Sequence, residues 1–136
     1  MGTRADFYVG RGEEAEWLGS IAWDGYPDGI PDEIKTAANE AVFREAVEKM
    51  IQERDDGTHP RDGWPWPWED SRTTDYAYAF YDGAVYASCF GSAWWEATAE
   101  GPEHEEEDRK AATFPNMKER MNVNFGKRSG LIIVGE

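Results

Sequence analysis

The sequence DYAYAFYDGAVYASCF, residues 75–90, predicts a β-hairpin whose register can be worked out residue by residue. Asp82-Gly83 suits a tight two-residue turn, because both central positions of that turn need a positive φ. Aromatic and small side chains alternate on either side, as is typical of paired strands. The register sets large side chains mostly opposite small ones, which favours cross-strand packing. One face pairs Phe80 with Val85, Tyr78 with Ala87 and Tyr76 with Cys89, and the other pairs Tyr81 with Ala84, Ala79 with Tyr86 and Ala77 with Ser88.

A second hairpin is expected at the start of the chain. Residues 4–10 alternate the apolar Ala5, Phe7 and Val9 with Asp6 and Tyr8, which predicts a half-buried strand. Residues 16–23 alternate again, and a regular strand would place three large side chains on one face: Trp17, Ile21 and Trp23. The short apolar run at residues 131–134 predicts a buried final strand.

One long helix is expected between the two hairpins. Pro31 suits the first position of a helix, and the apolar residues that follow recur every four positions as far as Met50. We expect the helix to run to about Arg54, with Gly57 as a left-handed cap. A further turn or two of helix is expected at residues 114–121. The order of elements predicts a single domain over residues 1–136, of class α+β. Its sheet is expected to be mostly antiparallel, with about five strands and one main helix packed across it.

The charge limits the classes of partner. The chain of 136 residues has 28 acidic and 14 basic residues, a formal net charge of −14. A field of this sign repels phosphates and disfavours direct binding of nucleic acid. The densest run of acids suits either a solvated surface or a face that meets a basic protein. The candidate binding residues in this run are Glu103, Glu105, Glu106, Glu107 and Asp108.

Residues suited to catalysis or metal binding are few. His59 and His104 lie in polar stretches, and Cys89 falls in the middle of an expected strand. No spacing typical of a zinc or calcium site occurs, so we expect no catalytic residue, no metal and no cofactor. The least arbitrary alternative site is the turn at Asp24–Asp28, where a pair of carboxylates lies beside aromatic residues. Aspartate is also a common turn former, so a purely structural role is the competing interpretation.

Tryptophan is unusually frequent, with seven residues in the chain. Three of them alternate with proline in Trp64-Pro65-Trp66-Pro67-Trp68, a pattern that excludes helix and favours an extended course. Exposed tryptophans would suit a protein-binding hot spot, which makes Trp64, Trp66 and Trp68 candidate anchors. The competing interpretation is that the segment lies flat over the sheet and closes the core.

The turn Trp23-Asp24-Gly25-Tyr26-Pro27-Asp28-Gly29, together with Gly2-Thr3-Arg4, resembles a group of short bacteriophage and prophage proteins. The resemblance covers about the first thirty residues and transfers no functional residue. It implies a viral or mobile-element origin. Small acidic phage proteins are often inhibitors of host defence, such as anti-restriction or anti-CRISPR proteins that imitate the charge of nucleic acid.

These observations favour a non-enzymatic, acidic protein-binding protein. We expect its partner to be a host protein with a basic surface, as for a phage-type inhibitor of a nucleic-acid-handling defence complex. The alternatives are a small ligand-binding or hydrolytic domain with its site at Asp24–Asp28, and a homo-oligomeric structural phage component. A single cysteine predicts a reducing, cytoplasmic location, and no apolar run approaches the roughly 20 residues of a membrane span.

Overall fold

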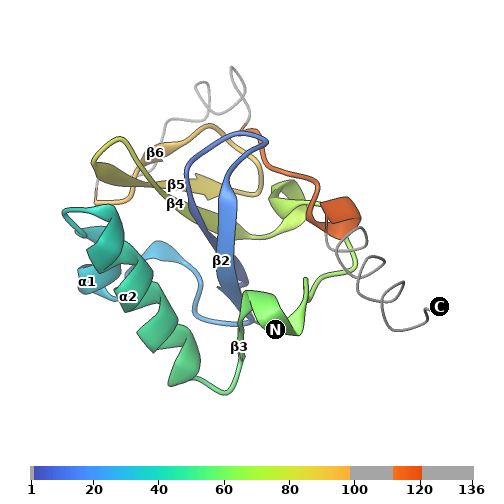
Figure 1. Cartoon of the computed structure of the whole chain (residues 1–136), viewed down its shortest axis with the longest axis horizontal. Helices are drawn as coiled ribbons and strands as arrows, with labels where there is room; N and C mark the ends of the chain where they lie inside the picture. Colours follow the sequence, from blue (N-terminus) through green and yellow to red (C-terminus); the bar gives the residue numbers. More distant parts are fainter. Residues whose placement is uncertain (1, 99–111, 121–136) are drawn as a thin grey trace, which may run out of the picture.

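The computed structural model describes residues 2–98 and 112–120, and it is α+β. Its centre is a mixed six-stranded sheet with the strand order β3-β2-β1-β4-β5-β6 (Figure 1). Only β1 and β4 run parallel, and the other neighbours are antiparallel. In chain order the elements are β1 (Ala5–Val9), β2 (Glu16–Ile21), η1 (Pro27–Gly29), α1 (Asp32–Lys35), α2 (Glu40–Gln52), β3 (Gly57–Thr58), η2 (Pro60–Asp62), η3 (Ser71–Thr73), β4 (Tyr76–Tyr81), β5 (Ala84–Cys89) and β6 (Trp95–Glu96).

The hairpin of β4 and β5 confirms the register predicted from the sequence. All six expected pairs are present, from Tyr76 opposite Cys89 to Tyr81 opposite Ala84. Asp82 has a φ of 53° and Gly83 a φ of 85°, as the two-residue turn requires. The turn chemistry therefore sets the register of this hairpin.

The first hairpin forms as expected, but an irregularity in β2 changes which side chains share a face. Phe7 pairs with Gly19 while Tyr8 pairs with Trp17, so Leu18 is an extra residue in a β-bulge. A bulge shifts the alternation of side chains by one position. The expectation that Trp17 and Ile21 share a face is therefore wrong, and the two side chains pack into different cores.

Strand β1 is buried on both faces, not half-buried as its alternating pattern suggested. Its polar residue Asp6 is 0% exposed and Tyr8 is 1% exposed. The cause is its central place in the sheet, between β2 and β4, with chain covering each face. The polar side chains of β1 must consequently find partners inside the protein.

The expected single helix is two helices with a break at residues 36–39. Thr36 ends α1, and the side chain of Asn39 caps α2 by accepting a hydrogen bond from the N–H of Val42 at 2.9 Å. The predicted cap at Gly57 is also wrong, because Gly57 belongs to β3 and pairs with Ile21. The four-residue spacing of apolar side chains continues across the break, so this pattern did not indicate where α1 ends and α2 begins.

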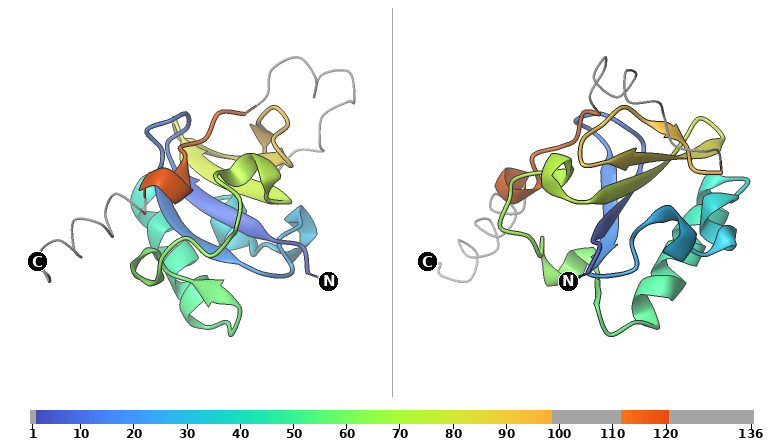
Figure 2. Two further views of the ribbon diagram at one scale, coloured as in Figure 1. Left: turned by 90° about the vertical axis from the view of Figure 1, so that its right-hand side faces the viewer. Right: turned by 180° about the vertical axis from the view of Figure 1, so that it is seen from behind.

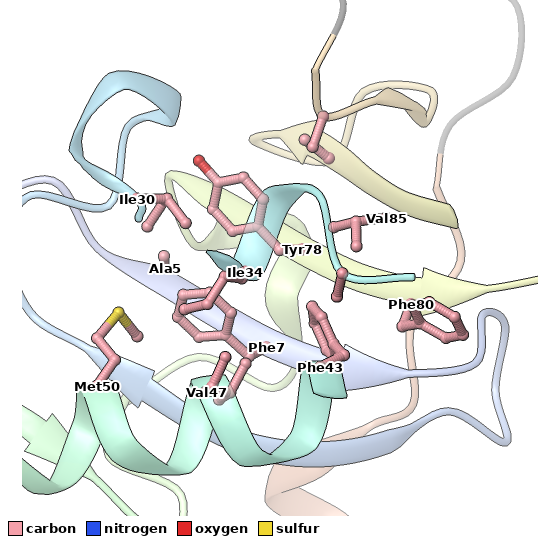
Figure 3. Close-up of a cluster of buried hydrophobic side chains, with 14 of the residues drawn as sticks. Ala5, Phe7, Ile30, Ile34, Phe43, Val47, Met50, Tyr78, Phe80 and Val85 are labelled. Atoms are coloured by element: carbon pink, nitrogen blue, oxygen red, sulfur yellow. The ribbon is translucent and has the colours of Figure 1, made fainter. Parts of the chain in front are cut away.

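The larger core lies between the sheet and the two helices (Figure 3). Phe7 and Tyr78 stack on adjacent strands with ring centroids 5.4 Å apart, and Phe43 of α2 packs against Phe80 at 5.8 Å. Ile34 of α1 is completely buried in the same cluster. Burial of these side chains fixes both helices on one face of the sheet.

The opposite face of the sheet is covered by irregular chain rather than by long helices (Figure 2). Tyr8, Trp17 and the alanines of β4 form a smaller core there, against residues 112–117. The helical turn expected near residues 114–121 is present at residues 117–120 in the described region. The expected strand at residues 131–134 lies outside the described residues. Two short strands that the sequence did not predict, β3 and β6, complete the edges of the sheet.

Candidate functional site

The Trp-Pro segment, residues 64–68, lies against the smaller core with its three tryptophans half-buried and its prolines exposed. Trp64 packs edge-on against Trp17, with ring centroids 5.1 Å apart. Trp66 and Trp68 stack on each other at 5.5 Å. The segment thus covers the sheet while keeping part of each indole at the surface.

Each indole N–H of the Trp-Pro segment donates to an acceptor inside the protein. Trp64 donates to the backbone carbonyl of Trp68 at 2.8 Å, and Trp68 donates to the hydroxyl of Thr74 at 2.9 Å. Trp66 donates to the carboxylate of Asp6 at 2.7 Å. The polar edges of these rings are therefore used internally, and only their apolar faces and edges remain for a partner.

Asp6 is the centre of a buried hydrogen-bond network. Besides Trp66, its carboxylate accepts from Ser20 at 2.5 Å and from Ser71 at 2.6 Å. The two serines are held in turn, because Ser20 accepts from the indole of Trp17 at 3.1 Å and Ser71 lies 2.7 Å from the hydroxyl of Tyr8. Since both serine protons point at Asp6, the Tyr8 hydroxyl donates to Ser71. All these donors converge on one carboxylate.

Burial dominates the ionisation of this network. Removal from water raises the pKa of Asp6 above its usual value, although hydrogen bonds from Ser20, Ser71, Trp66 and Thr74 oppose the rise. Burial also raises the pKa of Tyr8, which therefore stays protonated as a donor. Among the described residues no Lys or Arg forms an ion pair with Asp6, and its charge is balanced by aligned dipoles. The network joins the Trp-Pro segment to β1 and η3.

Arg4 borders the outer side of the Trp-Pro segment. Its guanidinium lies 5.8 Å from the ring centroid of Trp66 and 5.4 Å from that of Trp68, and it pairs with Asp75 at 3.3 Å. This is a cation–π arrangement that covers part of the stacked pair. A binding role for Trp64, Trp66 and Trp68 remains a prediction. The acidic candidates Glu103, Glu105, Glu106, Glu107 and Asp108 lie outside the described residues.

The turn proposed as an alternative site is tightly held. Asp24 has a φ of 66°, and its carboxylate lies 3.5 Å from the guanidinium of Arg54. Asp28 is exposed in η1. The two carboxylates are thus in different settings, one beside a cation and one in solvent. Trp23 and Tyr26 of the same turn are 51% and 42% exposed, and no pattern in the sequence marked their exposure as functional.

Arg11, in the turn between β1 and β2, lies among three aromatic side chains. Its guanidinium lies 4.5 Å from the ring centroid of Tyr81, 4.9 Å from that of Tyr86 and 5.9 Å from that of Trp94. The β1–β2 turn carries Arg11 across β4 and β5 to reach these rings. This contact uses a cation of the chain to fasten the turn to the sheet.

The described residues contain no group of three or more His, Cys, Asp or Glu side chains suited to holding a metal ion. His59 is the N-cap residue of η2, where its backbone N–H donates to the side chain of Asp62, and Cys89 is half-buried at the end of β5. An open depression of about 650 Å³ lies beside η3, with Arg72 and Arg120 in its wall. Arg72 pairs with Asp70 at 2.9 Å, and Arg120 donates to the carbonyls of Ala15 and Glu13. The cations of this depression are thus tied to the protein itself.

Most basic side chains in the described regions are used internally. Five of them form ion pairs within the chain, namely Arg4, Lys35, Arg44, Arg54 and Arg72. Lys118 and Arg120 donate to backbone carbonyls, and Arg11 lies among aromatic rings. Alongside the exposed Lys49 of α2, five exposed carboxylates lie on the two helices and just after α2: Asp32, Glu33, Glu45, Glu48 and Glu53. We call these five residues the helical acidic face.

No protein-family model, curated protein or solved structure matches the chain. Across residues 2–98 and 112–120, no helix has the length and apolar character needed to cross a membrane.

Proposed function

We propose that this chain is a non-enzymatic, acidic protein-binding protein that docks on a basic surface of another protein. The observation that carries the proposal is the internal use of its cations. The net charge is −14, and the described Arg and Lys side chains are mostly paired or buried against carbonyls and rings. The unpaired carboxylates therefore dominate the electrostatic field that an approaching partner encounters.

The helical acidic face gives this field a defined shape. Glu45 and Glu48 lie one turn apart on α2, and Asp32 and Glu33 begin the neighbouring α1. Because α2 is fixed to the sheet by its buried apolar side, the backbone positions that carry its outward carboxylates are fixed relative to one another. A dense array of negative charges resembles the phosphates of nucleic acid to a basic site. The proposed partner is therefore a nucleic-acid-handling host complex, inhibited by charge imitation in the cytoplasm, as for a phage-encoded inhibitor.

The proposal is tested by removing the same amount of charge from two different places on the protein. Glu45→Gln, Glu48→Gln and Glu53→Gln together neutralise part of the helical acidic face. Glu13→Gln, Glu14→Gln and Glu96→Gln together remove the same charge from exposed positions on the sheet and its loops. Each tagged variant is used to recover proteins from bacterial lysate at low and moderate salt, with mass spectrometry as the readout.

We expect the wild type to retain a nucleic-acid-handling complex at low salt and to lose it as salt rises. The helical variant should lose it at lower salt than the matched control. Duplex DNA added to the recovered complex should displace the chain if the two occupy one site. Recovery that is the same for all three proteins, or unaffected by salt and DNA, would contradict the proposal.

A further inference from the structure

Trp23 is the exception among the seven tryptophans. It is 51% exposed, whereas the others are buried or half-buried. Tyr26, which follows Gly25, is 42% exposed. We call residues 23–29, which carry both side chains, the aromatic turn. Large aromatic side chains held in water are the residue types that most often anchor protein interfaces.

The aromatic turn is fixed by elements far from it in sequence. The carboxylate of Asp56 accepts hydrogen bonds from the N–H groups of Ala22 and Trp23, both at 3.0 Å. Arg54 donates to the carbonyl of Trp23 at 2.8 Å, and the buried hydroxyl of Tyr78 donates to the carbonyl of Gly25 at 2.7 Å. The backbone on each side of Trp23 is therefore held in place before any partner arrives.

The turn also closes tightly on itself. Gly29 donates to the carbonyl of Tyr26 at 2.8 Å, and a side chain at Gly29 would collide with the backbone of Asp24. Asp24 keeps its positive φ under these constraints. Lys35 of α1 donates to the carbonyl of Pro27 at 2.7 Å, which ties the far end of the turn to the helix. A rigid backbone reduces the entropy lost on binding to that of the side chains alone.

The charge around the turn selects a cationic partner. The side chain of Asp24 is 53% exposed and lies 3.5 Å from Arg54, and that of Asp32 is 92% exposed and lies 3.8 Å from Lys35. Asp28, in η1, is exposed and forms no ion pair with the described residues. The two cations beside the turn are already engaged, Arg54 with Asp56 and Asp24, and Lys35 with the carbonyl of Pro27 and with Asp32. Asp28 is therefore the carboxylate of the turn that is left to a partner's cation. Guanidinium and ammonium groups stack on tryptophan and tyrosine rings and also pair with carboxylates. The exposed rings and the exposed carboxylate of the turn therefore both favour an arginine or lysine side chain of the partner.

We propose that the aromatic turn is the anchoring point of the interface, where Trp23 and Tyr26 receive an arginine- or lysine-bearing segment of the partner protein. This inference rests on the proposed function and names the place of contact. The helical acidic face steers the partner toward the chain, and the aromatic turn holds it. Arginine should bind better than lysine, because its planar group stacks on the indole while it pairs with a carboxylate.

The test uses a defined probe, a short peptide of alternating arginine and glycine, with lysine–glycine and serine–glycine peptides of equal length. Binding is measured at low salt by NMR titration of the backbone amide signals, and the indole N–H signal of Trp23, identified by its loss in Trp23→Phe, reports contact at this residue in the wild type. The variants are Trp23→Ala and Tyr26→Ala. The matched control is Phe90→Ala, which removes a 62% exposed aromatic side chain outside the aromatic turn.

We expect the arginine peptide to shift the Trp23 signal and to bind about tenfold more weakly to Trp23→Ala, with a smaller loss for Tyr26→Ala. Phe90→Ala should bind like the wild type, and the serine peptide should not bind. Arginine-peptide binding that is equal in Trp23→Ala and in the wild type would overturn the inference and leave the proposed function standing. Failure of the arginine peptide to bind the wild type would overturn both.

Discussion

Trp66 donates a hydrogen bond of 2.7 Å to the carboxylate of Asp6, although 60 residues separate them in the chain. The bond joins the Trp-Pro segment to the central strand β1 from the side opposite the helices. Ser71, which follows the segment, donates to the other oxygen of the same carboxylate at 2.6 Å. A single buried acid thus holds the covering chain at two points.

Trp66→Phe should lower the free energy of unfolding by about 1–3 kcal/mol. The ring keeps most of its packing, but the buried carboxylate loses a donor. Trp64→Phe is the matched control, because it removes an indole bond to a neutral group, the backbone carbonyl of Trp68. Bonds to charged groups are the stronger class, so its cost should be smaller. Urea denaturation measures both, and equal losses would mean that Asp6 is not the anchor.

The stability of the protein should depend on pH through Asp6. Burial raises the pKa of Asp6 in the folded state above the usual 3.8, so the folded state holds its proton to higher pH than the unfolded state does. The free energy of unfolding should therefore fall as pH rises from near 4 through the raised pKa. Asp6→Asn removes this term, and its stability relative to the wild type should increase over the same pH range.

This difference is obtained from urea denaturation of the wild type and Asp6→Asn at a series of pH values. Subtracting one free energy of unfolding from the other at each pH cancels the contributions of the acidic residues that the two proteins share. A difference that stays constant would show that the hydrogen bonds balance burial, and one that decreases with rising pH would show that they outweigh it; either result would contradict the prediction.

Asp56 should show the opposite pH dependence. Burial raises the pKa of its carboxyl, but hydrogen bonds from Arg54 and from the backbone of Trp23 and Ala22 lower it below the usual 3.8 overall. Its contribution to stability is present above that value and is lost as pH falls through the lowered pKa. Asp56→Asn should therefore cost most at neutral pH and least in acid. Thermal unfolding of both proteins at several pH values measures this cost, and a cost independent of pH would argue against an ionic role.

Gly83→Ala should destabilise the protein by about 1–2 kcal/mol. Gly83 has a φ of 85°, and no atom lies within 4 Å of the place that an alanine methyl group would take, so the cost is that of the backbone conformation alone. The measurement is the midpoint of urea denaturation. An unchanged midpoint would show that the hairpin register does not depend on this turn.

Local turn chemistry made part of the fold predictable from the sequence. Asp82-Gly83 favours one type of tight turn, and the pairing of β4 with β5 follows from that turn. The first hairpin was also predictable, but the bulge at Leu18 was not, because nothing in the alternation marks an extra residue. The break before α2 was missed for a related reason. Asn39 is a good cap, yet the apolar spacing runs through it.

The candidate site was less predictable because its contacts are long-range. Asp6 looked like a solvent-facing residue of an alternating strand, and its burial depends on the Trp-Pro segment folding back over β1. One signal was available: seven indole N–H groups need acceptors when buried, and a polar side chain in an apolar strand, such as Asp6, is one kind of acceptor. The exposure of Trp23 depends equally on distant groups, above all Asp56 and Tyr78.

The most direct test of the proposed function is the rate of association with the recovered partner, measured over a range of salt concentrations. A partner steered to its site by the negative field should associate quickly at low salt, and the rate should fall steeply as salt rises, with a smaller effect on dissociation. Neutralising the helical acidic face should flatten this dependence more than the matched control does. An association rate that does not change with salt in the wild type would contradict the account.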